Sequence, residues 1–299
     1  MDIDLDVSAP EWLAAPKQAF FYQTIVNALQ SSRLSDSQAK SRAIENSTIY
    51  LCTSVGSRKE SQDVMWRFSM VVVAIIWQIP HDHVYQDILT DAVISLCKRT
   101  EPNEKFGKGD TFWDDWESLP ELLMFITDVR QDPIACFGEQ APREKITNFQ
   151  RLTSFTARLT GAGYTKWMNW PGNELSHALG ATREKGMAFD CGLWIATEWL
   201  LRSADAIYIA LNEWEGGLEV QDTWKILRPI GSALQKWQAW RQRLVELKEN
   251  WGEWEFKETT LERIKQAIQE METVEQRHAK IGEEQNADKC ADSAMKVGK

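Results

Sequence analysis

The apolar residues recur with the spacing of α-helices along most of the chain, and this pattern constrains the fold more than any other feature. Residues 187–212 are apolar on several faces, which is typical of a helix surrounded by other helices. Alternation of apolar and polar residues between turn residues, the pattern of strands, is almost absent. We therefore predict an all-α fold in which amphipathic helices pack around a buried central helix.

The length and the C-terminal composition set the expected domain organisation. A chain of 299 residues accommodates one large domain or two small ones. We predict a single helical domain over residues 1–281. Residues 282–299 are polar, and their composition is typical of a disordered tail.

Charge and hydropathy exclude several classes of partner and location. The formal net charge is -10 and no basic cluster could follow a phosphate backbone, so we expect no nucleic-acid partner. The longest apolar run, residues 70–77, is far shorter than the roughly 20 residues of a membrane span. The N-terminus lacks the features of a signal peptide, and the 5 cysteines include no CxxC pair. We expect a cytoplasmic protein in a reducing compartment.

The sequence PHDH, from Pro80 to His83, follows a strongly apolar segment and precedes a helical pattern. Proline suits the first position of a helix, and Asp82 in the first turn would complement the helix dipole. His81 and His83 point about 200° apart on a helix, so they are poorly placed to share a metal ion. The pattern favours a helix start, with His81 as an alternative acid–base residue and a metal site as the third possibility.

Acidic residues at 110–117 raise the question of a magnesium-dependent cyclase, but the DDxxD spacing fails because Ser118 occupies its last position. The motifs GxSxG, GxGxxG, HExxH and the P-loop are absent from the sequence. We therefore expect no metal and no nucleotide or nicotinamide cofactor. Glu198, Arg202 and Asp205 are spaced by four and three residues and could pair along one helix face, as a structural ion pair or as part of a site.

Several blocks, in order, resemble a large fungal family catalogued only as a domain of unknown function. IWQIPHDHVYQDILTDAV (76–93) resembles its IPHDHPAQ block, and LTSFTARLTGAG (152–163) resembles its NxFxARLTAAG block. Further similar blocks are FWDDWESLPELLMFITD, LWIATEWLLRSADAIYIAL, LQKWQAWRQRL and AIQEME. The resemblance covers nearly the whole chain and implies an all-helical, soluble protein often encoded beside specialised-metabolite pathways. It implies no defined activity.

The connection over residues 163–189 departs from the family pattern YAIWALRDALE, and divergent segments on a fixed scaffold often carry function. His177 in this segment could transfer a proton near neutral pH, and Arg183 could bind a carboxylate or orient a carbonyl. A solvated helix face is the alternative interpretation. The candidate catalytic residues are His177, His81, Arg183 and Glu198.

The chain contains 15 tryptophans, an excess that indicates either bulky core packing or an aromatic ligand pocket. For the second case, the candidate substrate-binding residues are Trp116, Trp167, Trp170, Asn173 and Trp194. We predict an enzyme of fungal specialised metabolism, a cofactor-free cyclase or isomerase acting on an apolar terpenoid or polyketide. The alternative is a non-enzymatic helical interaction or regulatory protein, whose protein partner the sequence does not identify.

Overall fold

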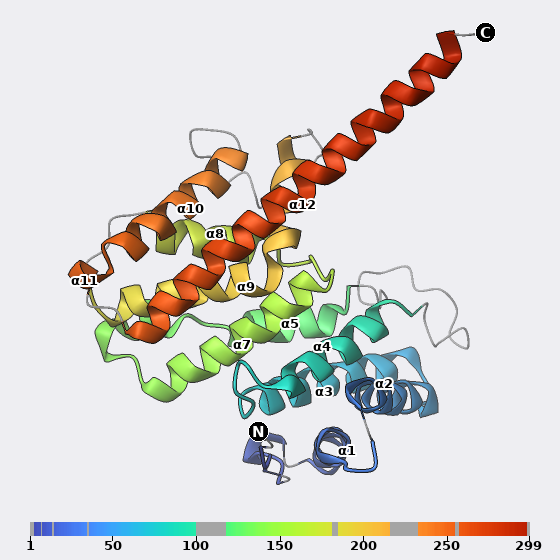
Figure 1. Ribbon diagram of the computed structural model, residues 1–299. Helices are drawn as coiled ribbons and strands as arrows, with labels where there is room; N and C mark the ends of the chain where they lie inside the picture. Colours follow the sequence, from blue (N-terminus) through green and yellow to red (C-terminus); the bar gives the residue numbers. More distant parts are fainter. Residues whose placement is uncertain are drawn as a thin grey trace. The chain divides into compact units, whose positions relative to one another are not determined.

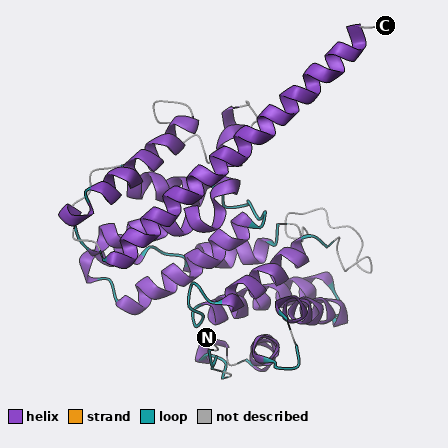
Figure 2. Cartoon of the chain, viewed as in Figure 1, coloured by secondary structure: helices purple, strands orange, loops and turns teal. Residues whose placement is uncertain are grey.

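The computed structural model describes residues 3–6, 8–13, 15–34, 36–99, 118–180, 185–215, 233–254 and 257–297. Within these residues the regular elements are helices, with no strand, which confirms the predicted all-α fold (Figure 2). The chain divides into two compact units. Unit 1 comprises residues 1–168 and 186–191, and unit 2 comprises residues 169–185 and 192–299.

Unit 1 is built mainly from paired helices that bury apolar faces. α2 packs against α4, α3 packs against α5, and α7 packs against α3 and α4 (Figure 1). The helices are α1 (Pro16–Gln30), α2 (Ser37–Ser54), α3 (Arg58–Ile76), α4 (Val84–Cys97), α5 (Pro120–Val129), α6 (Pro133–Phe137) and α7 (Arg143–Gly161), with short 3-10 turns η1 (Glu11–Leu13) and η4 (Gly138–Gln140).

Helix α3 forms the centre of the apolar core of unit 1. Its last six residues, 71–76, are all apolar and all buried. Ser57 caps its start, because the hydroxyl accepts a hydrogen bond from the backbone N–H of Glu60 at 3.3 Å. The helix ends before Pro80, where a proline cannot continue the hydrogen-bonding pattern.

Unit 2 contains the remaining helices. α10 packs against α8 and α12, and the last turns of α12 extend beyond the other helices of this unit (Figure 1). These helices are α8 (Asn169–Leu179), α9 (Met187–Glu215), α10 (Ala233–Glu249), α11 (Trp251–Trp254) and α12 (Glu258–Val297). Most of α9 belongs to unit 2, and its first residues belong to unit 1.

Helix α9 is the buried helix that the apolar pattern predicts. Between Leu193 and Leu200, every residue except Trp194 is buried. At Ser203 the backbone leaves helical geometry, with φ -143° and ψ 20°, so α9 is two helical segments joined by a kink. The buried hydroxyl of Ser203 donates to the carbonyl oxygen of Trp199 at 2.8 Å.

Two predictions on the chain as a whole stay predictions. One is the single domain over residues 1–281. The other is the disordered tail over residues 282–299, although α12 is helical through Val297. No helix in the described ranges combines the length and the apolar composition that crossing a bilayer requires.

Candidate functional site

The PHDH sequence forms a tight turn in unit 1, followed by a helix. The backbone N–H of His83 donates to the carbonyl oxygen of Pro80 at 3.1 Å, and α4 begins only at Val84. The predicted helix start at Pro80 is therefore wrong by four residues. His83 has extended backbone geometry, and its Nδ1 accepts a hydrogen bond from the backbone N–H of Tyr85 at 3.2 Å. The expectation that PHDH caps a helix is confirmed, with His83 as the capping residue.

His81 lies in the same turn, beside the second family-like block. Its carbonyl oxygen accepts a hydrogen bond from the hydroxyl of Ser154 on α7 at 3.0 Å. Arg158, one turn further along α7, donates to Ser154 and forms an ion pair with Asp87 of α4 at 2.6 Å. The Arg158 side chain is 5% exposed. The PHDH turn and the ARLT sequence thus hold α4 and α7 together through a polar network.

Trp167 is a predicted substrate-binding residue that belongs to the core of unit 1. Its side chain is 1% exposed, and its indole N–H donates to the hydroxyl of Thr160 at 2.8 Å. Its ring centroid lies 4.6 Å from that of Tyr164, whose hydroxyl donates to the backbone carbonyl of Ser118. A buried indole with a satisfied N–H is typical of packing.

Helix α8 carries three of the candidate residues of unit 2. Asn173 and His177 are exposed, and their spacing of four residues places them on one face of the helix. Trp170 is half-buried. On another side of α8, Glu174 accepts a hydrogen bond from the indole N–H of the buried Trp199 at 2.5 Å. Trp199 thus ties α8 to α9.

Glu198 on α9 is fully buried and bonded to two arginines. Its Oε2 lies 2.6 Å from Nη2 of Arg263 on α12, and its Oε1 lies 3.2 Å from Nε of Arg202. Arg263 also donates to the hydroxyl of Thr197 at 3.2 Å, and its guanidinium carbon lies 4.5 Å from the ring centroid of Trp194. We call Trp194, Glu198, Arg202 and Arg263 the arginine cluster. Its two cations stabilise the ionised carboxylate.

Asp205 does not continue this cluster along α9. The predicted pair between Glu198 and Arg202 is confirmed, whereas Asp205 bonds to α12 instead. Its Oδ1 lies 2.9 Å from Nη1 of Arg277 and 3.0 Å from Nε2 of His278. The cause is the kink between Arg202 and Asp205, which breaks the regular spacing on which the predicted stripe depends.

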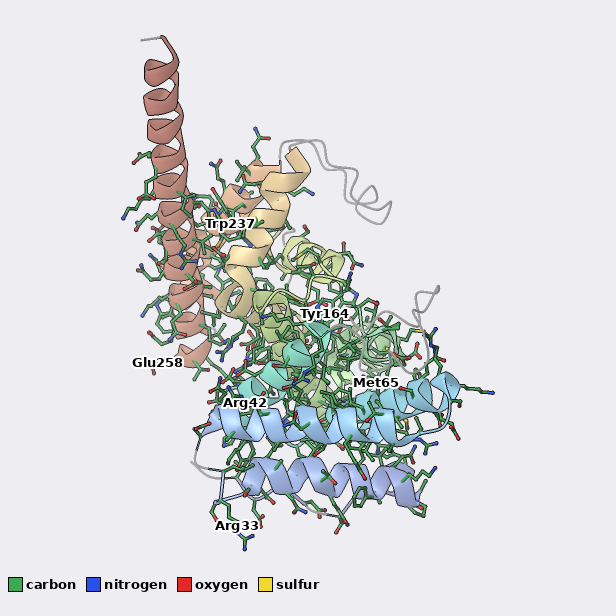
Figure 3. All side chains as sticks on the ribbon, turned by 90° about the vertical axis from the view of Figure 1, so that its right-hand side faces the viewer. Arg33, Arg42, Met65, Tyr164, Trp237 and Glu258 are labelled. Atoms are coloured by element: carbon green, nitrogen blue, oxygen red, sulfur yellow. The ribbon has the colours of Figure 1, made fainter. Side chains whose placement is uncertain are left out.

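Helix α10 joins α12 through a tryptophan and a carboxylate. The indole N–H of the buried Trp237, which lies on α10 (Figure 3), donates to Glu275 of α12 at 2.8 Å. The ring centroid of Tyr208 lies 5.1 Å from that of Trp237. Nη1 of Arg241 lies 3.4 Å from Oε2 of Glu275. Trp199 and Trp237 thus both bury their rings and donate to a glutamate on a neighbouring helix.

The predicted site residues therefore separate into groups. Glu198 and Trp194 share the arginine cluster, His177 and Asn173 share a face of α8, and His81 and Trp167 belong to unit 1. Trp116 and Arg183 lie outside the described residues.

Sequence reasoning missed Arg263. It lies 65 residues from Glu198, and no local pattern in α12 indicates a charged partner on another helix. It also missed Arg158, although the family-like ARLT block could have drawn attention to that residue.

Comparison with known proteins places most of this chain in one family model. Residues 70–244, more than half of the chain, match a model described as a protein of unknown function (DUF3632). This range includes the PHDH turn, the ARLT sequence and Glu198. No curated protein and no solved structure matches the chain.

Proposed function

The chain belongs to the DUF3632 family, whose description assigns no activity, and we propose that it is a helical interaction protein in which unit 2 recognises a partner. The family-like blocks connect the chain with fungal specialised metabolism, so we place the partner in that context. An interaction protein is the alternative to an enzyme that the sequence analysis left open.

The environment of Glu198 carries the proposal. An acid–base carboxylate must exchange a proton with a substrate, but both oxygens of Glu198 are bonded to arginines and the side chain is 0% exposed. Glu198 therefore serves to position α9 against α12. This use of one of the catalytic candidates of unit 2 favours a structural and recognition role.

The buried tryptophans support the same proposal. Trp167, Trp199 and Trp237 are each at most 1% exposed, and each indole N–H donates to a side chain of the protein. Their ring area contributes to packing between helices, which accounts for part of the tryptophan excess. Rigid helix pairs of this kind present fixed surfaces to a partner.

The cysteines support a cytoplasmic location. Cys52, Cys97, Cys136 and Cys191 are present as thiols. Disulfides form and persist in oxidising compartments, whereas thiols persist in a reducing compartment. We therefore propose the cytoplasm as the place where the partner is met.

Cross-linking in the producing cells tests the interaction. A lysine-reactive reagent, followed by purification and peptide mass spectrometry, reports which surfaces meet another protein. We expect cross-links from Lys265 and Lys280 of unit 2, with the exposed Lys17 of unit 1 as the matched control. Equal labelling of all three lysines by unrelated proteins would contradict recognition through unit 2.

A second candidate function is the cofactor-free cyclase or isomerase. The exposed face of α8 favours it, because His177 and Asn173 stand together in the segment that departs from the family pattern. The purified protein would be incubated with an extract of apolar terpenoids and polyketides, and the products would be followed by mass spectrometry. If the protein is such an enzyme, we expect a new product, and the rate of its formation should fall about 100-fold or more in the variant His177→Asn. Unchanged turnover in that variant would remove His177 from the reaction.

A further inference from the structure

Two guanidinium groups in the arginine cluster share one buried carboxylate. Glu198 carries one negative charge, whereas Arg202 and Arg263 together carry two positive charges. The cluster therefore has an excess of one positive charge, in a chain whose formal net charge is -10. An excess cation held in place next to a buried ion pair favours an additional anion.

Arg202 is the member of the cluster that can reach such an anion. Its side chain is 33% exposed, whereas that of Arg263 is 16% exposed. Among the described residues, Arg202 is bonded only through Nε, to Glu198, which leaves both terminal nitrogens without a protein acceptor. Because Nε is fixed, the two terminal NH2 groups are held in the fork geometry that matches a carboxylate.

Among the described residues, Glu198 is the one carboxylate paired with Arg202. Asp205 is the next carboxylate along α9 after Arg202, and the kink at Ser203 lies between the two residues. Its Oδ1 is bonded to Arg277 and His278 on α12. Asp205 and Arg277 thus balance each other, and the excess charge stays with the arginine cluster.

We propose that Arg202 binds a carboxylate group through its two terminal nitrogens, with Glu198 and Arg263 as positioning residues. The carboxylate can come from an acidic side chain of a protein partner or from a small organic acid, and the chemistry at Arg202 is the same. The site does not depend on the proposed interaction function, because an organic acid would bind it equally in an enzyme.

The test uses 4-fluorobenzoate as a probe and follows its fluorine NMR signal during titration with the full-length protein. Saturable binding is expected for 4-fluorobenzoate, with no binding of the neutral 4-fluorobenzamide. Arg202→Gln should weaken binding about tenfold or more, since a bidentate charged pair is lost. Arg202→Lys should also weaken binding, because it keeps the charge but not the fork.

Arg277→Gln is the matched control. It removes one positive charge from unit 2 at a residue already paired with Asp205, and it should change the affinity less than about twofold. Thermal unfolding of each variant checks that the fold is retained. A similar loss in both glutamine variants would show attraction by general charge and overturn the site.

Two competitors identify the source of the carboxylate. An acetylated and amidated tetraglutamate peptide that displaces the probe at lower concentration than free benzoate would support the site and assign it to a protein partner. Stronger displacement by benzoate would support the site and assign it to an organic acid. Equal displacement by inorganic phosphate, or no binding of 4-fluorobenzoate to the unaltered protein, would overturn the proposal.

Discussion

Helices α3 and α9 are both buried, but they are stabilised by different interactions. The buried end of α3 is entirely apolar, and its stability comes from the removal of apolar surface from water. Helix α9 buries Thr197, Glu198 and Ser203 among its apolar residues. A buried charge is tolerated only where a partner is fixed in place, and α12 supplies that partner as Arg263. The comparison teaches that the stability of α9 depends strongly on one residue distant in the sequence, whereas the stability of α3 is the sum of many small apolar contacts.

The largest effect is expected from removing that partner. Arg263→Met removes the arginine that is bonded to Oε2 of the buried Glu198, so the free energy of unfolding should fall by about 3–4 kcal/mol. Urea denaturation measures the change. The control is Arg277→Met, at an ion pair whose side chains are 50% and 44% exposed, and it should cost less than about 1 kcal/mol. The double variant Glu198→Leu/Arg263→Met should recover much of the loss. A cost below about 1 kcal/mol for Arg263→Met would break the contrast between α9 and α3.

A loss that scales with the volume removed is expected in α3. Ile75 is fully buried, so Ile75→Ala should lower the free energy of unfolding by about 3 kcal/mol, and Ile75→Val by about 1 kcal/mol. Because neither change leaves a polar group without a partner, the cost should follow the number of methyl groups removed. Equal costs for valine and alanine in urea denaturation would show that α3 is not packed as described.

Trp199 offers a smaller test of the polar side of the comparison. Trp199→Phe keeps most of the buried ring but removes the N–H that donates to Glu174, so a loss of about 1–2 kcal/mol is expected. Thermal unfolding measures the change. The control is Trp251→Phe, whose effect on the free energy of unfolding should be near zero because Trp251 is exposed. If both variants melt at the same temperature, the bond between α8 and α9 contributes no stability.

The sequence predicts those features that depend on neighbouring residues. The helical spacing identifies α3 and the buried α9, and the spacing of four residues identifies the pair between Glu198 and Arg202. The predicted start of α4 at Pro80 is wrong because the side chain of His83 caps the helix, which therefore begins four residues later, at Val84.

The remaining features depend on packing between distant segments. Arg263 meets Glu198 only because α12 lies against α9, and no pattern within either helix specifies that contact. The kink at Ser203 likewise replaces the predicted stripe at Asp205 by contacts with α12. Trp167 is buried with its indole N–H bonded to Thr160. The number of tryptophans in the sequence does not distinguish such a core residue from one that lines a pocket.

The last prediction concerns a chemical rate instead of the free energy of unfolding, and it compares a cysteine at the α3 core with one at the surface. Burial raises the pKa of Cys52 on α2 to about 12, while the hydrogen bond with Ser61 of α3 acts in the opposite direction. The unfolded thiol loses its proton near 9.0, so below about pH 12 the folded protein holds much less of the reactive thiolate of Cys52 than the unfolded chain does. Iodoacetamide at pH 8.5 should therefore modify Cys52 about 100-fold more slowly than the exposed Cys136. Peptide mass spectrometry over time follows both cysteines at once, and equal rates would mean that the α2–α3 core does not protect Cys52.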